Sequence, residues 1–547
     1  MKKRGYIIFS AIFFFCSLFA IAGVQLEKDG NLIWTGSFVA KLLFCSLLIG
    51  LVGGVGITTL FLAFEKRKKE DELMQVKRTM KKRNVFLISC VGSFLAWIPI
   101  FLAFYPGNCT YDIGGQTWYI VSGNYEAHHP IAHTLLMELF VNMGTWIGNV
   151  NLGMAFYVLF QMVCLAAAFA FGITLFYWLG MNWKWLLALQ LWAMLFIPNW
   201  YMSISTTKDV IFSAAVLVML LCLYRILLQK RNELRIDGWD IGFWITGVLM
   251  ILFRNNGKYA LLVTFVFSVI IVLFARQNKK MFMRISLGCV CILAVGSLAL
   301  STLSYLTNAS DIRKEEMLSV PIQQLSRVMN YQEEIDEEYK AVIDGFIINE
   351  AYQNYIPSIS DPVKSSVDVG YISGNLKGFV STYFHLLAQY PGDFINAVLA
   401  LDAGYLNPFD MTHKDVYTWG ASWLRVGWSP YEELGLTQDP VFENLNKVLR
   451  DFADGNKYTN IPVLGYFVMP GGYLWMCALF AGWLLWKKKY SYLFLLSYIA
   501  GYYVTLILGP TVQLRYIYTV MITLPFLFVA MVGRRNDNLV TSIKSAE

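Results

Sequence analysis

Charged residues are scarce in this sequence. Only 15% of its 547 residues are Asp, Glu, Lys or Arg, whereas 57% are hydrophobic. Much of this hydrophobicity lies in continuous runs of roughly 20 residues, the length that a helix needs to cross a bilayer, and a soluble core does not require such runs. The scarcity of charge therefore excludes an ordinary soluble protein and indicates an integral membrane protein.

Cysteine is almost absent outside the apolar runs, and several common signatures are missing altogether. Eight of the nine cysteines fall inside the runs, so Cys109 alone cannot build a disulfide framework. The sequence has no internal repeat and no Walker or Rossmann glycine pattern, which argues against a nucleotide-driven machine. Its charge of +7 does not indicate nucleic acid, because the basic residues flank apolar runs, where they bind lipid headgroups.

The apolar runs predict an all-α membrane protein with about twelve transmembrane helices. The seventh run is short for a straight crossing, which predicts a tilted or broken span or a locally thinned bilayer. The predicted spans cover residues 6–26, 38–64, 84–104, 152–179, 184–201, 209–228, 241–253, 259–275, 285–303, 463–486, 490–508 and 517–533.

The basic residues predict the orientation of these spans. Lys and Arg are retained on the cytoplasmic side during insertion, and every second connection is basic. We therefore expect a multi-pass protein of the cell membrane with both termini in the cytoplasm. The first run also resembles a signal peptide with a cleavage site near residues 20–22, and cleavage there would preserve every later orientation. The basic stretches are 2–4, 66–83, 230–235, 276–284, 487–489 and 534–535.

One long polar region divides the chain. Residues 304–462 carry 22 of the 37 acidic residues and 11 of the 44 basic ones, and the alternation of loops puts them outside. We predict a transmembrane block over 1–303, a mostly helical extracytoplasmic domain over 304–462, with helices near 333–349 and 378–400, and a second transmembrane block over 463–547. The aromatic residues of the outer domain favour a membrane-surface belt over contacts with sugar faces; they are Tyr405, Tyr417, Trp419, Trp423, Trp428 and Tyr431.

The first outer loop, within 105–150, carries an acidic residue between two turn signals. Pro106 and Gly107 end the third span, and Gly114 and Gly115 predict a second turn just after Asp112. These signals predict a carboxylate on a tight loop at the membrane surface. Residues 130–147 then have helical spacing, which predicts a helix lying in the interface.

Three later outer turns each carry a cation. Lys208, Arg254 and Arg515 stand against the positive-inside bias, so each is a functional candidate. If they converge near Asp112, the fitting ligand is a lipid-linked phosphate, bound by Arg forks and a Lys point charge. Asp112 could then take the proton of an acceptor hydroxyl while the cations stabilise the departing polyprenyl phosphate. The pattern therefore favours glycosyl transfer.

Several short motifs carry a resemblance to a known superfamily: Tyr105-Pro106-Gly107, Asp112, Gln116, His128-His129-Pro130, Lys208-Asp209 and Arg254-Asn255-Asn256-Gly257. With the many spans, the outer domain and an Arg before the last span, they resemble the GT-C superfamily of polyprenyl-phosphate-sugar-dependent glycosyltransferases, and more closely a family of bacterial multi-span membrane proteins related to it. The resemblance implies that Asp112 is the catalytic acidic residue and that Arg515 contacts phosphate. This sequence lacks the adjacent Glu of some such transferases, which leaves the use of a divalent metal open.

Each candidate residue also has a structural interpretation. Asp112 could cap a turn or helix, Lys208 and Asp209 could form a local ion pair, and Arg515 could extend to lipid headgroups. His129 could orient substrate or could be an ordinary hydrogen-bonded interfacial histidine. The predicted substrate-binding residues are Tyr111, Gln116, His128, His129, Lys208, Asp209, Arg254, Asn255, Asn256 and Arg515.

Three neighbouring histidines invite a metal-site interpretation. Pro130 interrupts the helix that would align His129 with His133, and no complete ligand set accompanies them. We therefore predict no metal-ligating residues.

The sequence thus predicts an enzyme of the bacterial cell envelope that moves a sugar from a polyprenyl-phosphate donor to an extracytoplasmic acceptor, which would be a cell-wall polymer, a glycolipid or a protein. The alternative is a transporter or flippase of lipid-linked saccharides, and a non-catalytic scaffold is a third hypothesis. Transporters usually carry polar groups near the bilayer midplane. Here these groups gather toward one face, which favours the enzyme.

Overall fold

The computed structural model describes residues 2–29, 31–71, 79–109, 111–274, 277–311, 314–409, 433–454, 457, 461 and 464–532. Over these residues the chain is helical, with isolated β-bridges and no strand. The helices of the first block are α1 (Lys2–Asp29), α2 (Gly36–Asp71), α3 (Lys82–Ala103), α4 (Tyr111–Ser122), α5 (Ile131–Ile147), α6 (Val150–Trp178), α7 (Trp183–Leu195), α8 (Ile197–Ile204), α9 (Lys208–Gln229), α10 (Gly238–Phe253), α11 (Gly257–Phe274) and α12 (Lys279–Leu306).

The remaining helices form the C-terminal block and the polar region predicted to be extracytoplasmic, which we call the outer region. They are η1 (Lys314–Leu318), α13 (Ser319–Tyr331), α14 (Glu337–Phe346), η2 (Ile348–Asn354), α15 (Asp361–Lys364), α16 (Val369–Gly374), α17 (Leu376–Gln389), α18 (Pro391–Leu401), α19 (Ala403–Leu406), α21 (Glu443–Asp454), α22 (Leu464–Val468), α23 (Pro470–Trp486), α24 (Tyr490–Leu493), α25 (Leu496–Ile507) and α26 (Leu514–Val532).

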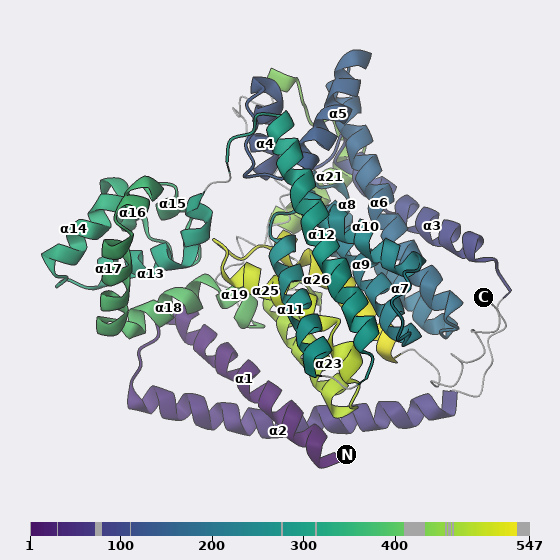
Figure 1. Ribbon diagram of the computed structural model, residues 1–547, viewed down its shortest axis with the longest axis horizontal. Helices are drawn as coiled ribbons and strands as arrows, with labels where there is room; N and C mark the ends of the chain where they lie inside the picture. Colours follow the sequence, from purple (N-terminus) through teal and green to yellow (C-terminus); the bar gives the residue numbers. More distant parts are fainter. Residues whose placement is uncertain are drawn as a thin grey trace.

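Helix α9 lies at the centre of the helical body. It packs against α6, α10 and α26 (Figure 1), and nearly all of its residues are buried. Its 22 residues are mostly apolar after a polar first turn, with Ser213 and Arg225 as exceptions. At 1.5 Å per residue α9 is about 33 Å long, close to the ~30 Å of a bilayer's hydrocarbon core. The two ends of α9 therefore lie about one membrane thickness apart.

The all-α class of membrane protein predicted from the sequence agrees with these helices. Within the described part of the chain, nine helices are long and apolar enough to cross a membrane, or ten if the bent pair α7 and α8 forms one span. The other two predicted spans correspond to α10, with 16 residues, and α23, with 17. The total of twelve remains a prediction.

The fifth predicted span is bent. Helices α7 and α8 meet at Phe196 and differ in direction by 52°. Pro198 stands in the first turn of α8, where its missing N–H costs no helix hydrogen bond. The side chain of Asn199 donates to the carbonyl of Ala193 across the break at 3.1 Å. These contacts hold the bend within the protein.

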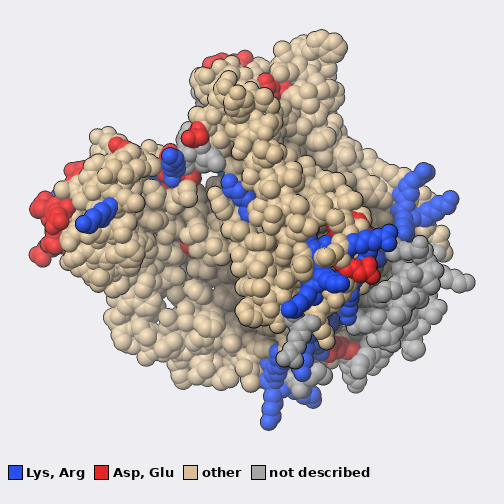
Figure 2. Space-filling view, in the orientation of Figure 1, with Lys and Arg blue, Asp and Glu red and all other residues tan. Residues whose placement is uncertain are grey.

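Basic residues from separate connections gather at one end of the helices. Arg4 donates to the hydroxyl of Tyr490 at 3.0 Å, and Lys487 pairs with Glu65. On α3 and α9, Lys82 and Arg225 both stack on Trp178 of α6, with the charged groups 3.7 Å and 5.2 Å from the ring centroid. Figure 2 shows Lys and Arg concentrated at the lower right and Asp and Glu on the outer region at the left.

The outer region has a hydrophobic core of its own between α13 and α18. Ile322, Phe346 and Phe394 are among its buried residues. The helix expected at 333–349 is shorter, as α14, and the helix expected at 378–400 is interrupted at Pro391, where α18 begins. Pro391 has no N–H to continue the hydrogen bonding of α17.

The last part of the polar region, 433–454, returns to the helical body. Asn446 of α21 donates to the carbonyl of Ala103 at the end of α3 at 2.7 Å, and the hydroxyl of Tyr201 donates to the carbonyl of Leu449 at 2.7 Å. Leu436, Leu449 and Ala453 belong to the main core. This segment therefore packs with α3 and α8 rather than within the core of the outer region.

The N-terminal hairpin contacts the outer region. Helices α1 and α2 pack against each other and reach α18 and α19 at the lower left of Figure 1. Between the two helices, Asn31 accepts a hydrogen bond of 2.6 Å from Arg327. The side chain of Arg327 is fully buried and also donates to Asp393 at 3.2 Å, so this Arg joins the hairpin to the outer core.

Candidate functional site

The first outer loop is more helical than the sequence predicted. The expected turn at Gly114 and Gly115 is wrong, because α4 runs through both glycines. Tertiary contacts explain the difference. A Cβ at Gly115 would lie 3.2 Å from Nε2 of His129, so a glycine lets α4 approach the histidine closely. The next residue, Gln116, is buried and donates to Thr134 Oγ1 of α5 at 2.8 Å.

Backbone hydrogen bonds join the start of this loop to the turn before α9. The N–H of Asn108 donates to the carbonyl of Ile204 at 2.9 Å, and the N–H of Thr206 donates to the carbonyl of Asn108 at 2.9 Å. From α6, the buried side chain of Gln161 donates to the carbonyls of Ser203 and Ser205 at 2.8 Å and 2.7 Å. The turn that carries Lys208 is thus fixed against the first outer loop.

Lys208 lies beside His129. Its Nζ is 3.2 Å from Nδ1 of the histidine. The ring of His128 is 4.7 Å from that of His129, and the ring of Tyr119 in α4 is 6.0 Å from it. Tyr119 donates in turn to Glu126 at 2.7 Å. The histidine pair therefore lies between the start of α9 and α4.

Asp209 pairs with a residue from another helix. Its carboxylate forms an ion pair with Arg254, which immediately follows α10, and both side chains are buried. The hydroxyl of Thr207 accepts from the N–H of Asp209 and donates to its carboxylate at 3.0 Å, which caps α9. Lys208 thus contacts His129, and Asp209 pairs with Arg254.

Aromatic rings surround the guanidinium of Arg254. Its central carbon lies 5.6 Å, 5.7 Å and 4.7 Å from the ring centroids of Phe212, Tyr502 and Tyr516. The guanidinium carbon of Arg515 lies 4.9 Å from the centroid of Tyr516. Cation–π attraction of this kind stabilises a cation away from water. Two guanidinium groups are therefore held around one tyrosine ring at the start of α26.

Arg515 has further contacts with its own segment. Its Nε donates to Gln513 at 2.5 Å, and one terminal nitrogen donates to the hydroxyl of Tyr516 at 3.2 Å. Tyr502 donates to the backbone carbonyl of Tyr516 at 2.6 Å. These bonds fix the side chain of Arg515 in the first turn of α26. Arg254 lies on the same tyrosine ring.

The turn between α10 and α11 contacts the first outer loop directly. Asn255 donates to the carbonyls of Ala127 and His128 at 3.3 Å and 3.5 Å. The carbonyl of Asn256 accepts from the N–H groups of Tyr259 and Ala260 and so starts α11. Ligand binding by either asparagine stays a prediction, and the contacts here support the arrangement of the backbone.

His133 and Gln116 lie inside the protein. The ring of His133 contacts the Gln116 amide at 2.9 Å through Nδ1 and the hydroxyl of Tyr157 at 2.6 Å through Nε2. These groups join α4, α5 and α6. Gln116 thus connects these helices, and substrate binding by Gln116 stays a prediction.

Tyr125 fixes the end of the same loop. Its hydroxyl donates to Glu138 of α5 at 2.7 Å, and its carbonyl accepts from the N–H of Ser310 after α12 at 3.0 Å. Burial and the nearby Glu138 carboxylate raise the pKa of Tyr125 to about 12. The phenol therefore stays protonated and remains a donor at neutral pH.

Some predicted residues lie outside the part that the structure describes. The backbone of Tyr111 and Asp112 forms the first turn of α4, and their side chains are outside the described set. Six further residues lie outside the described part with backbone and side chain: His413, Tyr417, Trp419, Trp423, Trp428 and Tyr431. Tyr405 is described and is fully buried in the main core, so the predicted membrane-surface position is wrong for this residue.

Sequence reasoning missed several residues that build the site. Phe212, Tyr502 and Tyr516 surround Arg254, and Gln161 holds the turn before α9. Tyr516 follows Arg515 directly, which is a usable signal. Phe212 and Tyr502 lie in apolar helices, where an aromatic residue is ordinary. Among residues with described side chains, no group of three or more His, Cys, Asp or Glu is arranged to hold a metal ion.

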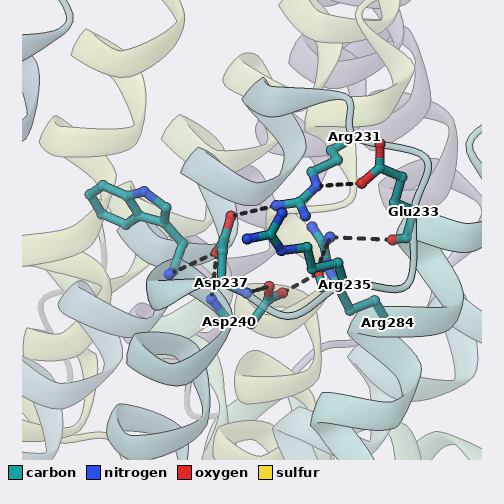
Figure 3. Close-up of polar contacts among 7 residues, drawn as sticks. Arg231, Glu233, Arg235, Asp237, Asp240 and Arg284 are labelled. Carbon is teal, nitrogen blue, oxygen red and sulfur yellow. Dashed lines mark hydrogen bonds and ion pairs between the residues drawn. The ribbon is translucent and has the colours of Figure 1, made fainter. Parts of the chain in front are cut away.

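A second polar cluster lies at the opposite end of α9 and α10 (Figure 3). Arg284 of α12 pairs with Asp240 of α10 at 2.9 Å and donates to the carbonyls of Glu233 and Arg235 at 3.3 Å and 3.0 Å. Asp237 and Asp240 form a reciprocal cap on α10. This cluster closes the connection between α9 and α10.

Together the helices and the two polar ends define an all-α membrane protein with a cationic, aromatic-lined site at one end of its core. The chain belongs to DUF6020, a family of unknown function whose sequence model matches residues 110–544. The match begins just before α4 and includes every residue of the site from Tyr111 to Arg515. No curated protein and no solved structure matches the chain.

Proposed function

We propose that this protein is a membrane glycosyltransferase that uses a polyprenyl-phosphate sugar as its donor and an extracytoplasmic acceptor. The observation that carries the proposal is the meeting of Lys208, Arg254 and Arg515 at one end of α9, α10 and α26. These residues are distant in sequence. Asp209 neutralises one charge, so the described cluster keeps an excess of positive charge.

A lipid-linked phosphate fits this position for two reasons. Arg forks and Lys ammonium groups are the usual ligands of phosphate oxygens. The cluster also stands at the end of a helix about as long as a bilayer is thick, so a bound phosphate would lie at the membrane surface with its polyprenyl tail among the helices. A free soluble anion has no lipid tail, so a position at the membrane surface would add nothing to its binding.

The proposed base, Asp112, stands in the first turn of α4. Asp112 precedes Gly115 by three residues in α4, and helix positions three apart lie on one face. Gly115 approaches His129, and His129 contacts Lys208. Gly115 and His129 thus connect α4, the helix that carries Asp112, with Lys208, which supports Asp112 as the base.

The proposed reaction follows from these positions. The acceptor hydroxyl attacks the anomeric carbon of the donor sugar, and its proton passes to the carboxylate of Asp112. The bond between that carbon and the phosphate oxygen breaks with its electrons on the oxygen. Arg254, Arg515 and Lys208 stabilise the phosphate that leaves. Positioned base catalysis contributes about 10²- to 10⁴-fold, and removing a preorganised charge donor costs a comparable factor.

The proposed orientation puts this end of the helices outside the cell. Basic groups from α1, α3, α9 and the loop after α23 gather at the opposite end, as the positive-inside tendency requires of a cytoplasmic face.

The test is a transfer assay on the purified full-length protein in lipid nanodiscs. The protein would be incubated with radiolabelled polyprenyl-phosphate sugars and with envelope polymers, glycolipids or proteins as acceptors. We expect labelled acceptor with the wild type, and a loss of about a hundredfold or more with Asp112→Asn and Arg515→Gln. Lys258→Gln is the matched control, because Lys258 is a cation in the first turn of α11 whose described contact is with the ring of Tyr259.

Full transfer by Asp112→Asn would exclude Asp112 as the base. The absence of labelled acceptor with the wild type would overturn the proposed function. Movement of the lipid-linked sugar across a vesicle membrane without covalent transfer would identify a transporter instead.

A further inference from the structure

The ring of His129 is fixed between two helices. On one side Nδ1 lies 3.2 Å from Nζ of Lys208, at the start of α9. On the other side Nε2 faces α4, where a Cβ at Gly115 would come within 3.2 Å. The side chain is buried, with 8% of its surface exposed. Its two nitrogens therefore have different and well-defined surroundings.

The lysine determines which nitrogen carries the hydrogen. An ammonium group has three N–H donors and no acceptor, so Nδ1 must accept in this contact. A neutral imidazole that accepts through one nitrogen carries its hydrogen on the other. A doubly protonated ring would direct an N–H at the ammonium 3.2 Å away. The contact thus requires a neutral ring with its hydrogen on Nε2.

We propose that Lys208 holds His129 as the neutral Nε2–H tautomer, with this N–H facing α4 at Gly115. His129 is then a positioning residue that acts through α4, where the proposed base Asp112 stands. The assignment of a role in transfer rests on the proposed function, and the assignment of the tautomer does not.

Gly115 is the second part of this arrangement. Alanine at this position would put a methyl group 3.2 Å from Nε2, which is closer than nearly all such contacts in proteins. The rings of Tyr119 and His128 limit the movement of the histidine away from that methyl group. The glycine therefore lets α4 and the Nε2 side of the His129 ring lie close together.

The tautomer can be observed without any substrate. The full-length protein would be labelled with ¹⁵N in its five histidine rings and studied in lipid nanodiscs by solid-state NMR, with the His129 signals identified as those lost in His129→Gln. We expect one protonated nitrogen, Nε2, and one unprotonated nitrogen, Nδ1. Lys208→Met should redistribute the hydrogen between the two, and Lys258→Met should leave it unchanged. A hydrogen on Nδ1 in the wild type, a doubly protonated ring, or no response to Lys208→Met would each overturn the proposal.

Two isosteric substitutions test the role in transfer. The amide nitrogen of Gln can occupy the position of Nε2, and that of Asn the position of Nδ1. We expect His129→Gln to keep most of the transfer rate and His129→Asn to lose about tenfold to a hundredfold, as for the loss of one buried hydrogen-bond donor. The reverse order would overturn the positioning role. If the wild type transfers no sugar, the proposed function fails while the NMR result still decides the tautomer.

Discussion

Two buried Asp–Arg pairs lie at opposite ends of the same helices, and their surroundings differ. At the end with the basic connections, Arg284 pairs with Asp240 and also donates to two backbone carbonyls of the loop after α9. At the other end, Arg254 pairs with Asp209, and the rest of its surroundings are aromatic rings, with the second cation Arg515 beside the same tyrosine.

The comparison separates a structural ion pair from a candidate binding site. Carbonyl oxygens are hydrogen-bond acceptors that share the task of the carboxylate, so the Arg284 end serves its own loop. Aromatic faces attract a cation without occupying its N–H donors. A second cation beside them raises the local positive potential, which favours an anionic ligand. Both Asp–Arg pairs are buried, so burial and pairing alone do not show which pair is structural and which belongs to a binding site.

The largest effect is expected at the structural end. Asp240→Leu leaves the charge of Arg284 buried without its carboxylate, which should lower the free energy of unfolding by about 3–5 kcal/mol. Adding Arg284→Met removes the stranded charge and should recover most of that loss. Denaturant titration in mixed micelles measures both variants. A single variant as stable as wild type would show that the pair does not hold this end.

The matched change at the other end should affect activity instead. The double variant Asp209→Leu with Arg254→Met removes the whole pair, so the protein should stay folded. Sugar transfer should nevertheless fall by about 10²- to 10³-fold, because a preorganised cation is gone. The transfer assay and a thermal unfolding curve on one sample compare the two properties. Unchanged transfer in a folded double variant would make this pair structural, like its counterpart.

The smallest effect is expected at the exposed margin of the structural end. Arg231 contacts Glu233 at 3.1 Å and Asp237 at 3.4 Å, and 66% of the Glu233 side chain is exposed. Pairs open to solvent contribute about 0–1 kcal/mol. Arg231→Gln should therefore shift the unfolding free energy by no more than that, with unchanged transfer. A loss as large as that of Asp240→Leu would make the exposed part of the cluster as important as the buried pair.

Local sequence patterns predicted the helices well where one pattern decided the outcome. The apolar runs correspond to helices from α1 to α26, and the helix expected over 130–147 is α5. Local sequence patterns failed where tertiary contacts opposed the local signal. Gly114 and Gly115 are turn residues by composition, yet α4 continues through them because Gln116 is bonded to α5 and Gly115 packs on His129.

The candidate site was only partly predictable for the same reason. Lys208, Arg254 and Arg515 were recognisable because each is a cation in a predicted outer turn, against the positive-inside bias. The choice of Arg254 as the partner of Asp209, 45 residues away, depends on how α9 and α10 pack. The tyrosines around Arg254 come from α25 and α26, and no local pattern distinguishes them from other buried aromatic residues.

The sequence by itself determined the apolar helices and the separation of basic connections from acidic outer segments. Hydrophobic length and local charge act on each segment independently, so they can be recognised in any stretch of the chain. Only the tertiary structure decided which charges meet, which nitrogen of His129 faces Lys208, and which of two buried arginines is surrounded by rings. Those properties depend on distances between helices that are far apart in sequence, and side-chain contacts form only after the helices have packed.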